Sequence, residues 1–323
     1  MMVLIGTENG LVALEDNGYE RFRALSGRAI SYLDTDADGR LLAIADDSDI
    51  IASSSLEEAE RNDSWHALGS LPDTRANCLV ELDGLIFVGA ADARMWVMPS
   101  EGGEPERIES FDDVPSRGEW DTPWGGPPDV RSLATIAGEA SAIYADIHVG
   151  WIVRSLDLGE TWTQLEGLHR DVHRVNSHRL APDRVYAATA QGCFISEDRG
   201  ETWEQHLEHF KPRNYQRCVM PDFEDPDLFL CTVSLGPHPK GDSGCEAMIF
   251  RTEDAGQTWE AAHEGLPAHF YHNINTHMLA ASIQRSNVFA FHDAAESVYL
   301  STDGAREWRK IATVEDALAV FTL

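Results

Sequence analysis

Short apolar runs alternate with clusters of turn-forming residues along the whole chain. Residues 41–45, 85–88 and 248–250 are typical of these runs, and Gly, Asp, Asn and Ser are frequent between them. Runs of this length, broken at short intervals by turn residues, predict β-strands joined by hairpins. We therefore expect an all-β fold.

The predicted strands fall into groups of four. In residues 172–208 they lie at 172–180, 184–189, 192–196 and 202–207. Comparable groups recur with a period of roughly 40 to 55 residues, which indicates a propeller or a solenoid. A chain of 323 residues is long enough for two domains, but the repeat favours a single one. The full groups span residues 28–68, 74–110, 128–167, 172–208, 214–266 and 275–313.

The two ends of the chain complete the number of blades. Residues 1–25 hold only three predicted strands, and residues 315–323 hold a single leftover strand. If this last strand pairs with the first three, the ring closes and no long strand edge stays exposed. The prediction is one domain over residues 1–323, a seven-bladed β-propeller closed by its C-terminal strand. Six and eight blades stay open as alternatives, because residues 28–110 carry the weakest repeat signal.

One eight-residue pattern recurs after the third strand of the later groups. It reads Ser/Thr-x-Asp-x-Gly-x-Thr-Trp at 155–162, 196–203 and 252–259, and a degenerate copy follows at 301–308. The carboxylate can accept hydrogen bonds from turn amides, the glycine supplies a positive φ, and the tryptophan offers an apolar face for packing between sheets. We therefore assign a structural role to the four aspartates: Asp157, Asp198, Asp254 and Asp303.

This pattern resembles the Asp-box (BNR) repeat of sialidases, xyloglucanases, sortilin-type receptors and photosystem II assembly-factor propellers. The resemblance implies a propeller whose Asp-box turns lie on the face away from the ligand site. It implies no single activity, because these families do unrelated things on one scaffold. Sialidases also carry a Phe-Arg-Ile-Pro motif and six blades. Here Phe22-Arg23-Ala24-Leu25 matches that motif poorly and is expected on an outer strand, which argues against a true sialidase.

The composition narrows the classes of partner. The net charge is −30, with 55 acidic and 25 basic residues, so a nucleic acid or an anionic membrane is not expected as a partner. The chain has no apolar run long enough to span a membrane, and its start lacks the features of a signal peptide. Five cysteines without a Cys-x-x-Cys pair favour free thiols in the cytoplasm. No nucleotide cofactor is expected.

The histidines concentrate where a propeller places its ligand site. In propellers of this kind, one face of the ring surrounds the mouth of the central channel. It carries the connections from the fourth strand of one blade to the first strand of the next, the connections from second to third strands, and the starts of the inner strands. Four of the 13 histidines lie elsewhere. The nine that map to this face are His148, His169, His173, His209, His238, His269, His272, His277 and His292.

Arginines are also expected at the channel mouth. Superposing the inner strands puts Arg131 (or Ser132), Arg174, Arg217 and His277 in similar places. Converging guanidinium groups bind anions in a bidentate manner, although pairing with acidic residues of the next blade stays an alternative. The candidate catalytic residues are His173, His277, Arg174, Arg217 and Arg131.

Aromatic and basic side chains occupy the loops of the same face. Together they suit a carboxylate-bearing or sugar-like ligand. The candidate substrate-binding residues are Trp120, Trp124, Lys211, Tyr215, His238 and Tyr271.

A divalent metal such as zinc, manganese or iron is a candidate cofactor, because neutral imidazoles are common ligands of these ions. Structural hydrogen bonding is the alternative role for each histidine. Asp146 or Asp293 would supply a carboxylate ligand or support one. The candidate metal ligands are His148, His173, His277 and His292.

Two functional hypotheses follow. The first is a hydrolase- or lyase-type enzyme, glycosyl-hydrolase-like, that acts on a small polar, carbohydrate-like or carboxylate-bearing substrate at the channel mouth. The second is a non-catalytic propeller that grips a peptide or a client protein. The concentration of imidazoles favours the enzyme.

Overall fold

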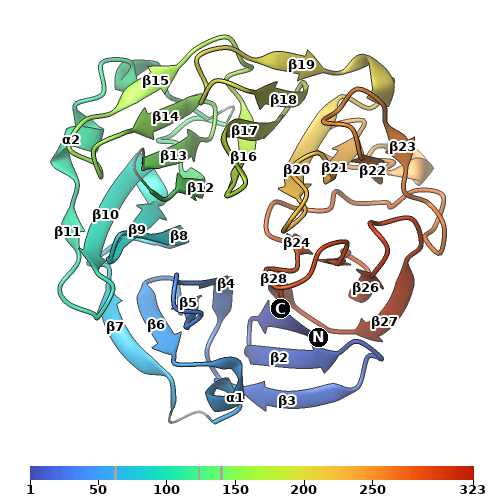
Figure 1. The fold of residues 1–323 in the computed structure, drawn as a ribbon, viewed down its shortest axis with the longest axis horizontal. Helices are drawn as coiled ribbons and strands as arrows, with labels where there is room; N and C mark the ends of the chain where they lie inside the picture. The colour runs from blue at the N-terminus through green and yellow to red at the C-terminus, as the bar shows by residue number, and fades with distance from the viewer. Residues whose placement is uncertain (62–63, 123, 139–140) are drawn as a thin grey trace.

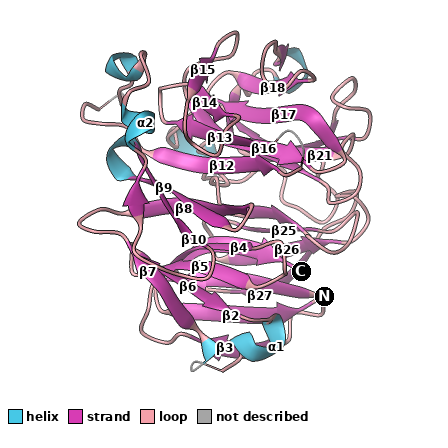
Figure 2. Cartoon of the chain, turned by 60° about the vertical axis from the view of Figure 1, so that its left-hand side comes forward, coloured by secondary structure: helices cyan, strands magenta, loops and turns pink. Residues whose placement is uncertain are grey.

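The computed structural model describes residues 1–61, 64–122, 124–138 and 141–323. Across these residues, seven four-stranded antiparallel sheets are arranged as blades around a central channel (Figure 1). In the side view the strands of neighbouring blades stack as successive layers, and the two short helices lie at the periphery (Figure 2). The structure therefore confirms the seven-bladed propeller.

Each blade contributes one strand to the channel. The strands of each blade are given from the channel outward. Blade one consists of β28 (Ala317–Thr322), β1 (Met2–Thr7), β2 (Gly10–Glu15) and β3 (Glu20–Ala24), and blade two of β4 (Ile30–Thr35), β5 (Leu41–Ala45), β6 (Asp49–Ser53) and β7 (His66–Ser70). Blade three consists of β8 (Ala76–Leu82), β9 (Leu85–Ala90), β10 (Arg94–Pro99) and β11 (Glu106–Arg107), and blade four of β12 (Val130–Ile136), β13 (Ala142–Ile147), β14 (Ile152–Ser155) and β15 (Thr163–Leu165). Blade five consists of β16 (Val172–His178), β17 (Ala181–Thr189), β18 (Gly192–Ser196) and β19 (Glu204–His206), and blade six of β20 (Tyr215–Pro221), β21 (Phe229–Ser234), β22 (Met248–Thr252) and β23 (Glu260–Ala261). Blade seven consists of β24 (Leu279–Ala281), β25 (Phe289–His292), β26 (Ser297–Ser301) and β27 (Arg309–Thr313). The helices are α1 (Leu56–Ala59) and α2 (Glu109–Asp112), and 3-10 turns lie at η2 (Ala91–Ala93), η3 (Arg117–Glu119), η4 (Glu208–Phe210) and η5 (Gly241–Ser243).

The C-terminal strand closes the ring as predicted. β28 pairs antiparallel with β1, and Val3 lies opposite Thr322 in this pairing. The two chain ends consequently lie close together in the first blade (Figure 1). Closure of this kind pairs β1 on both of its edges, with β28 on one side and β2 on the other.

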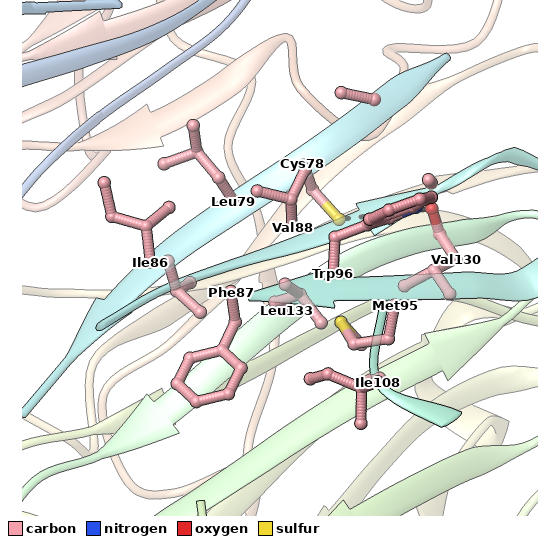
Figure 3. Close-up of a cluster of buried hydrophobic side chains, with 14 of the residues drawn as sticks. Cys78, Leu79, Ile86, Phe87, Val88, Met95, Trp96, Ile108, Val130 and Leu133 are labelled. Carbon is pink, nitrogen blue, oxygen red and sulfur yellow. Dashed lines mark hydrogen bonds between the residues drawn. The ribbon is translucent and has the colours of Figure 1, made fainter. Parts of the chain in front are cut away.

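Buried side chains fill the space between adjacent blades. The cluster around the third blade joins Phe87 and Met95 to Val130 and Leu133 of β12 (Figure 3). Packing is so close at Gly89 that an added Cβ would lie 2.5 Å from a Val130 methyl group. The third and fourth blades therefore interlock through this glycine, because no larger side chain fits there without a shift.

The Asp-box turns are held by hydrogen bonds to the aspartate. Asp157 Oδ1 accepts from the Ser155 hydroxyl (2.8 Å) and from the Thr161 amide (2.8 Å), and Oδ2 accepts from the Thr161 hydroxyl (2.5 Å). Trp162 donates its indole N–H to the Gly159 carbonyl (3.2 Å). These contacts confirm the structural role of the turn. The three bonds to the aspartate recur around Asp198 and Asp254, and the indole bond recurs at Trp259, which donates to the Gly256 carbonyl (2.8 Å).

The backbone of these turns departs from the prediction at one position. Gly159 has the expected positive φ of 92°, but the preceding Leu158 also lies in the left-handed region, at 54°. In the degenerate fourth copy, Gly304 takes the place of Leu158, and Ala305 takes the place of the glycine with a φ of 64°. Ala305 still donates its amide to the Ser301 hydroxyl (3.0 Å), so Asp303 keeps its turn despite the shifted glycine.

Two further expectations hold in the fold. Arg23 lies on the outer strand β3, where its guanidinium pairs with Glu20 (2.8 Å) at the surface and not at the channel. The five cysteines are free and buried. None of the helices that the described residues form is long and apolar enough to cross a membrane.

Candidate functional site

The inner strands carry a β-bulge near their first residues. In β12 the pairing register shifts between Val130 and Ser132, which makes Arg131 the extra residue. In the same way, His173 is the extra residue of β16 and Arg217 that of β20. A bulge leaves its residue out of the hydrogen-bond ladder and redirects its side chain. Blades two and three follow the same rule with Ser31 and Asn77.

Four of these bulge residues, all except His173, line a cavity of about 570 Å³ at the start of the inner strands, which we call the mouth cavity. Arg131, Arg217 and His277 all face it, as the sequence predicted. Asn77 and Asn275 add amide groups to the same wall.

Arg174 does not belong to the mouth cavity. Arg174 follows the bulge residue His173, so it lies level with Ser132, which follows the bulge residue Arg131 in β12. There its Nη1 donates to the Thr276 carbonyl, and the side chain lines a second cavity of about 250 Å³, the inner cavity. The pairing therefore aligns Arg174 with Ser132, the alternative that the sequence left open, and not with Arg131 and Arg217. The residue of β16 that is equivalent to these two arginines is His173, because all three strands carry the bulge at the same position.

The two mouth arginines lack acidic partners. Arg75 pairs with Asp129 (3.0 Å), but within the described residues neither Arg131 nor Arg217 forms an ion pair with a carboxylate. Arg131 Nη1 and Arg217 Nε are buried without a hydrogen-bond partner in this part of the chain. Burial lowers the pKa of the Arg131 guanidinium, although Asp146 opposes the shift. Of the two alternatives for these arginines, the structure favours free guanidinium groups over pairing between blades.

Tyr215 positions one of these guanidinium groups. The Arg217 guanidinium lies 5.2 Å from the centre of the Tyr215 ring, a distance that permits a cation–π interaction. The Tyr215 ring also packs against His173, with 4.7 Å between ring centres. Tyr215 is thus the candidate substrate-binding residue that contacts the arginine and histidine groups of the mouth.

An aspartate joins two of the predicted histidines beside the mouth cavity. His173 Nε2 lies 3.1 Å from Asp171 Oδ1, and His148 Nε2 lies 3.8 Å from the same oxygen. Burial lowers the pKa of His173 to about 4 and, with Arg131, that of His148 to about 3. Burial alone would raise the pKa of Asp171, but its contact with His173 and the neighbouring charges lower it on balance. Both imidazoles are therefore neutral at pH 7.

His277 crosses the channel. Its ring packs edge-on against Tyr32 of the second blade at 5.1 Å, and its carbonyl accepts from the Val320 amide (2.8 Å). The preceding Thr276 donates its hydroxyl to the carbonyls of His173 (3.2 Å) and Arg217 (3.3 Å). In the described part of the chain, His277 is the residue that lines both cavities, so it separates them.

The four candidate metal ligands are not brought together. His148 and His173 share Asp171, His277 lies against Tyr32, and His292 donates from Nε2 to the Val314 carbonyl (2.7 Å). Within the described ranges there is no group of three or more His, Cys, Asp or Glu side chains placed to hold a metal ion. These residues do not fit the predicted metal centre.

The two carboxylates named with the metal have other contacts. Asp146 is fully buried and accepts from the amide (2.5 Å) and the hydroxyl (2.6 Å) of Ser132, while burial raises its pKa to about 6. Asp293 accepts from the amides of Ala295 (2.9 Å) and Ser297 (2.8 Å). Both carboxylates therefore stabilise local backbone.

The two tryptophans predicted to bind substrate lie in different environments, one in the hydrophobic core and the other at the surface. Trp120 is only 8% exposed, packs against Phe111 of α2 and belongs to the hydrophobic core, so its assignment to the pocket is not supported. Trp124 follows in the same loop, of which residue 123 lies outside the described residues, and it is 73% exposed over the ring of His148. The two rings are tilted by 53° with 4.9 Å between their centres, and His148 itself is buried.

Three other loop residues lie on exposed segments away from the mouth cavity. Lys211 pairs with Glu208 at the surface (2.6 Å). His238 lies in the exposed insertion between β21 and β22. The Tyr271 hydroxyl donates to the Gly241 carbonyl (3.4 Å). The structure does not bring these three residues to the mouth arginines.

Comparison with known proteins supports the repeat assignment. Residues 150–272 match the model of the sortilin-Vps10 family (sortilin, neurotensin receptor 3). No match to the chain was found among curated proteins.

Three solved structures illustrate the likeness in fold. An ancestral GH74 enzyme superposes with a TM-score of 0.65 at 12% identity, over 97% of this chain and 40% of that chain. YCF48 bound to D1 peptide gives 0.56 at 14% identity, over 96% and 84%. YCF48 from Cyanidioschyzon merolae gives 0.52 at 11% identity, over 94% of each chain.

These identities show the fold and no activity. This chain also spans less than half the length of the GH74 chain that it resembles. The repeated Asp-box turns, the closed ring of seven blades and the sortilin-type match over residues 150–272 agree with one another. The chain is therefore a seven-bladed β-propeller of the Asp-box (BNR) type.

Proposed function

We propose that this propeller is a binding protein whose mouth cavity holds the carboxylate end of a peptide or client protein. The proposal rests on one observation: Arg131 and Arg217 face the mouth cavity and have no carboxylate partner in the described part of the chain. Planar guanidinium groups with free N–H donors match a carboxylate in a bidentate manner.

The electrostatics of the cavity support an anionic ligand. Three arginines (Arg75, Arg131 and Arg217) face two aspartates (Asp47 and Asp129) on its wall, on a chain whose net charge is −30. The mouth is therefore locally cationic within an acidic surface. Salt screens such long-range repulsion within about 8 Å at physiological ionic strength, so a carboxylate that reaches the mouth experiences mainly the nearby arginines.

The shape of the site suits a chain end better than an isolated anion. The arginines come from blades four and six, with His173 of blade five between them. A cavity of about 570 Å³ holds more than one carboxylate, and Asn77 and Asn275 offer amide groups that can pair with a peptide backbone. YCF48, which has been solved with the D1 peptide, offers a precedent on the same fold.

A hydrolase- or lyase-type enzyme at the same mouth is the second candidate, favoured by the contact between His173 and Asp171. A general base works best when its pKa is near the working pH. Burial holds His173 at a pKa of about 4, so its neutral imidazole would be a weak base at pH 7. For this reason we favour binding over catalysis.

A paired peptide screen tests the proposal. The purified propeller would be probed with N-acetylated random peptides made as free acids and as C-terminal amides. We expect free acids to bind selectively, and Arg131→Gln and Arg217→Gln each to weaken the selected peptides by at least about tenfold.

Arg309→Gln supplies the matched control, because it removes one positive charge from an exposed position on the outer strand β27. Equal binding of acids and amides, or equal losses in the control and the mouth variants, would contradict the proposal. Turnover of glucuronides or galacturonides by the wild type would instead support the enzyme.

A further inference from the structure

The inner cavity lies below the mouth, on the same axis. It has a volume of about 250 Å³ and is lined by the later residues of the inner strands, among them Asp34, Thr135 and Ser177. Thr276 and His277 cross the channel above it. Any ligand in this cavity is therefore separated from the mouth arginines and would enter from the opposite face of the ring.

A guanidinium group faces the inner cavity from the fifth blade. Arg174 Nη1 is fixed by the Thr276 carbonyl and lies 3.6 Å from the Cys218 sulfur. Its remaining nitrogens have no protein partner in the described ranges, and no ion pair with a carboxylate is formed there. One side of the guanidinium group is thus held, and the other is available to a ligand.

A carboxyl group faces the same cavity from the second blade. Asp34 Oδ1 accepts from the Thr35 amide (2.8 Å), while Oδ2 has no hydrogen-bond partner among the residues described. Burial raises the pKa of Asp34 to about 7, and Arg174 acts in the opposite direction. β4 and β16 are three blades apart in a ring of seven, so the two charged groups approach the cavity from different sides.

The rest of the wall combines apolar side chains with the polar groups of Ser132, Asn176 and Ser177. The apolar part includes Leu33, Val80, Leu133, Met220, Ile283 and Phe321. Small-molecule sites typically combine such a wall with a few polar groups that fix the orientation of the ligand. A volume of about 250 Å³ is just below the range of roughly 300 to 1,000 Å³ that is usual for such sites, and it suits a molecule the size of an amino acid.

We propose that the inner cavity binds a small zwitterion, an α-amino acid with an apolar side chain, as a second site independent of the mouth. Its carboxylate would pair with Arg174, its ammonium group with Asp34, and its side chain would contact the apolar wall. An anion without the ammonium group would leave Asp34 unpaired, and an amine without the carboxylate would leave Arg174 unpaired. Unpaired buried charges are costly, so the cavity selects a ligand that carries both.

Three probes of similar size test this selection on the whole wild-type protein. L-leucine carries both charges, 4-methylpentanoate lacks the ammonium group, and 3-methylbutylamine lacks the carboxylate. We expect saturable binding of leucine by calorimetry or ligand-observed NMR, with both analogues at least about tenfold weaker. Binding of either analogue within about threefold of leucine, or no saturable binding of leucine up to about 10 mM, would overturn the proposal.

Two variants locate the site. Asp34→Asn keeps the shape of the side chain but removes its charge, so leucine should bind at least about tenfold more weakly while 4-methylpentanoate binds as well as before or better. Arg131→Gln, at the mouth, should leave leucine binding unchanged. Unchanged binding in Asp34→Asn, or an equal loss in Arg131→Gln, would show that leucine does not occupy the inner cavity in the proposed orientation.

Discussion

The Asp-box turn of the fourth blade allows a quantitative test of what holds the ring together. Replacing Asp157 by alanine removes one acceptor that receives three hydrogen bonds, from the Ser155 hydroxyl and from the amide and hydroxyl of Thr161. Each such bond contributes roughly 0.5 to 1.5 kcal/mol net. Because the turn is at the surface and water can replace part of the loss, we expect the free energy of unfolding to fall by about 2 kcal/mol.

Thermal and urea unfolding measure this change. With an unfolding entropy of about 2.1 cal/mol/K per residue, a chain of 323 residues loses about 1.5 °C in Tm per kcal/mol. The Asp157→Ala variant should therefore unfold about 3 °C below the wild type. The urea midpoint should fall in parallel with an unchanged slope, because the surface exposed on unfolding is the same.

A glutamate in the same turn gives the matched control. Glu160→Ala removes the same charge three residues away, from an exposed side chain that makes no side-chain hydrogen bond or ion pair within the described residues. Its effect should stay within about 0.5 kcal/mol. If both variants lose the same stability, the loss comes from charge and the hydrogen-bond explanation is wrong.

The pH dependence of the free energy of unfolding gives a second test of the hydrogen-bond explanation. The hydrogen bonds from Thr161 and Ser155 outweigh burial and lower the pKa of Asp157. The stabilising effect is therefore fully present above the unfolded pKa of about 3.9 and is lost as the pH falls through the lower folded value. Wild type and Asp157→Ala should differ fully at neutral pH and converge in acid. A difference that grows below pH 4 would refute this explanation.

Two other predictions follow from the packing and from the inner cavity. Gly89→Ala places a Cβ 2.5 Å from Val130 and should lower the free energy of unfolding by about 1 to 3 kcal/mol. Gly118 has open space around it, so the control variant Gly118→Ala should change this free energy by less than about 1 kcal/mol. Chemical denaturation of the two variants and the wild type measures the difference. Asp34 has its pKa raised to about 7, so its ionisation disfavours the folded state as the pH rises from about 4 through 7. Asp34→Asn should match the wild type in stability near pH 4 and exceed it above pH 7, and an advantage that is largest in acid would contradict this.

The blades could be predicted from the sequence because each is a local unit. Hairpins with short turns keep the four strands of a blade adjacent in the chain, and the Asp-box marks one of these turns with a fixed residue pattern. Ring closure could be inferred as well, since one strand was left over at residues 315–323 and three at residues 1–25.

The geometry of the mouth could be predicted only in part. The sequence brought Arg131, Arg217 and His277 to one place, and the structure confirms this grouping. It placed Arg174 level with Arg131 and Arg217, although the equivalent residue of β16 is His173, because the superposition set this strand one residue out of register. It also missed the partner of His173, Asp171, although a carboxylate two residues before a candidate histidine was a visible signal.

Burial explains the remaining differences. The sequence assigned Trp120 to the ligand site from its residue type and its loop position, but the side chain packs against α2 in the hydrophobic core. The channel-crossing segment at Thr276 and His277 follows from the short inner strand β24, and the sequence predicted a full-length blade over 275–313. Both depend on contacts between segments far apart in the chain, which residue type and spacing do not encode.

One binding measurement tests the role of the mouth arginines most directly. For a peptide selected by the propeller, the dissociation constants of its free acid and its C-terminal amide would be compared in the wild type and in the Arg131→Gln/Arg217→Gln double variant. If the arginines hold the terminal carboxylate, the amide binds at least about tenfold more weakly to the wild type, and this ratio falls to about one in the double variant. A ratio that is the same in both proteins would show that the carboxylate is bound elsewhere or not at all.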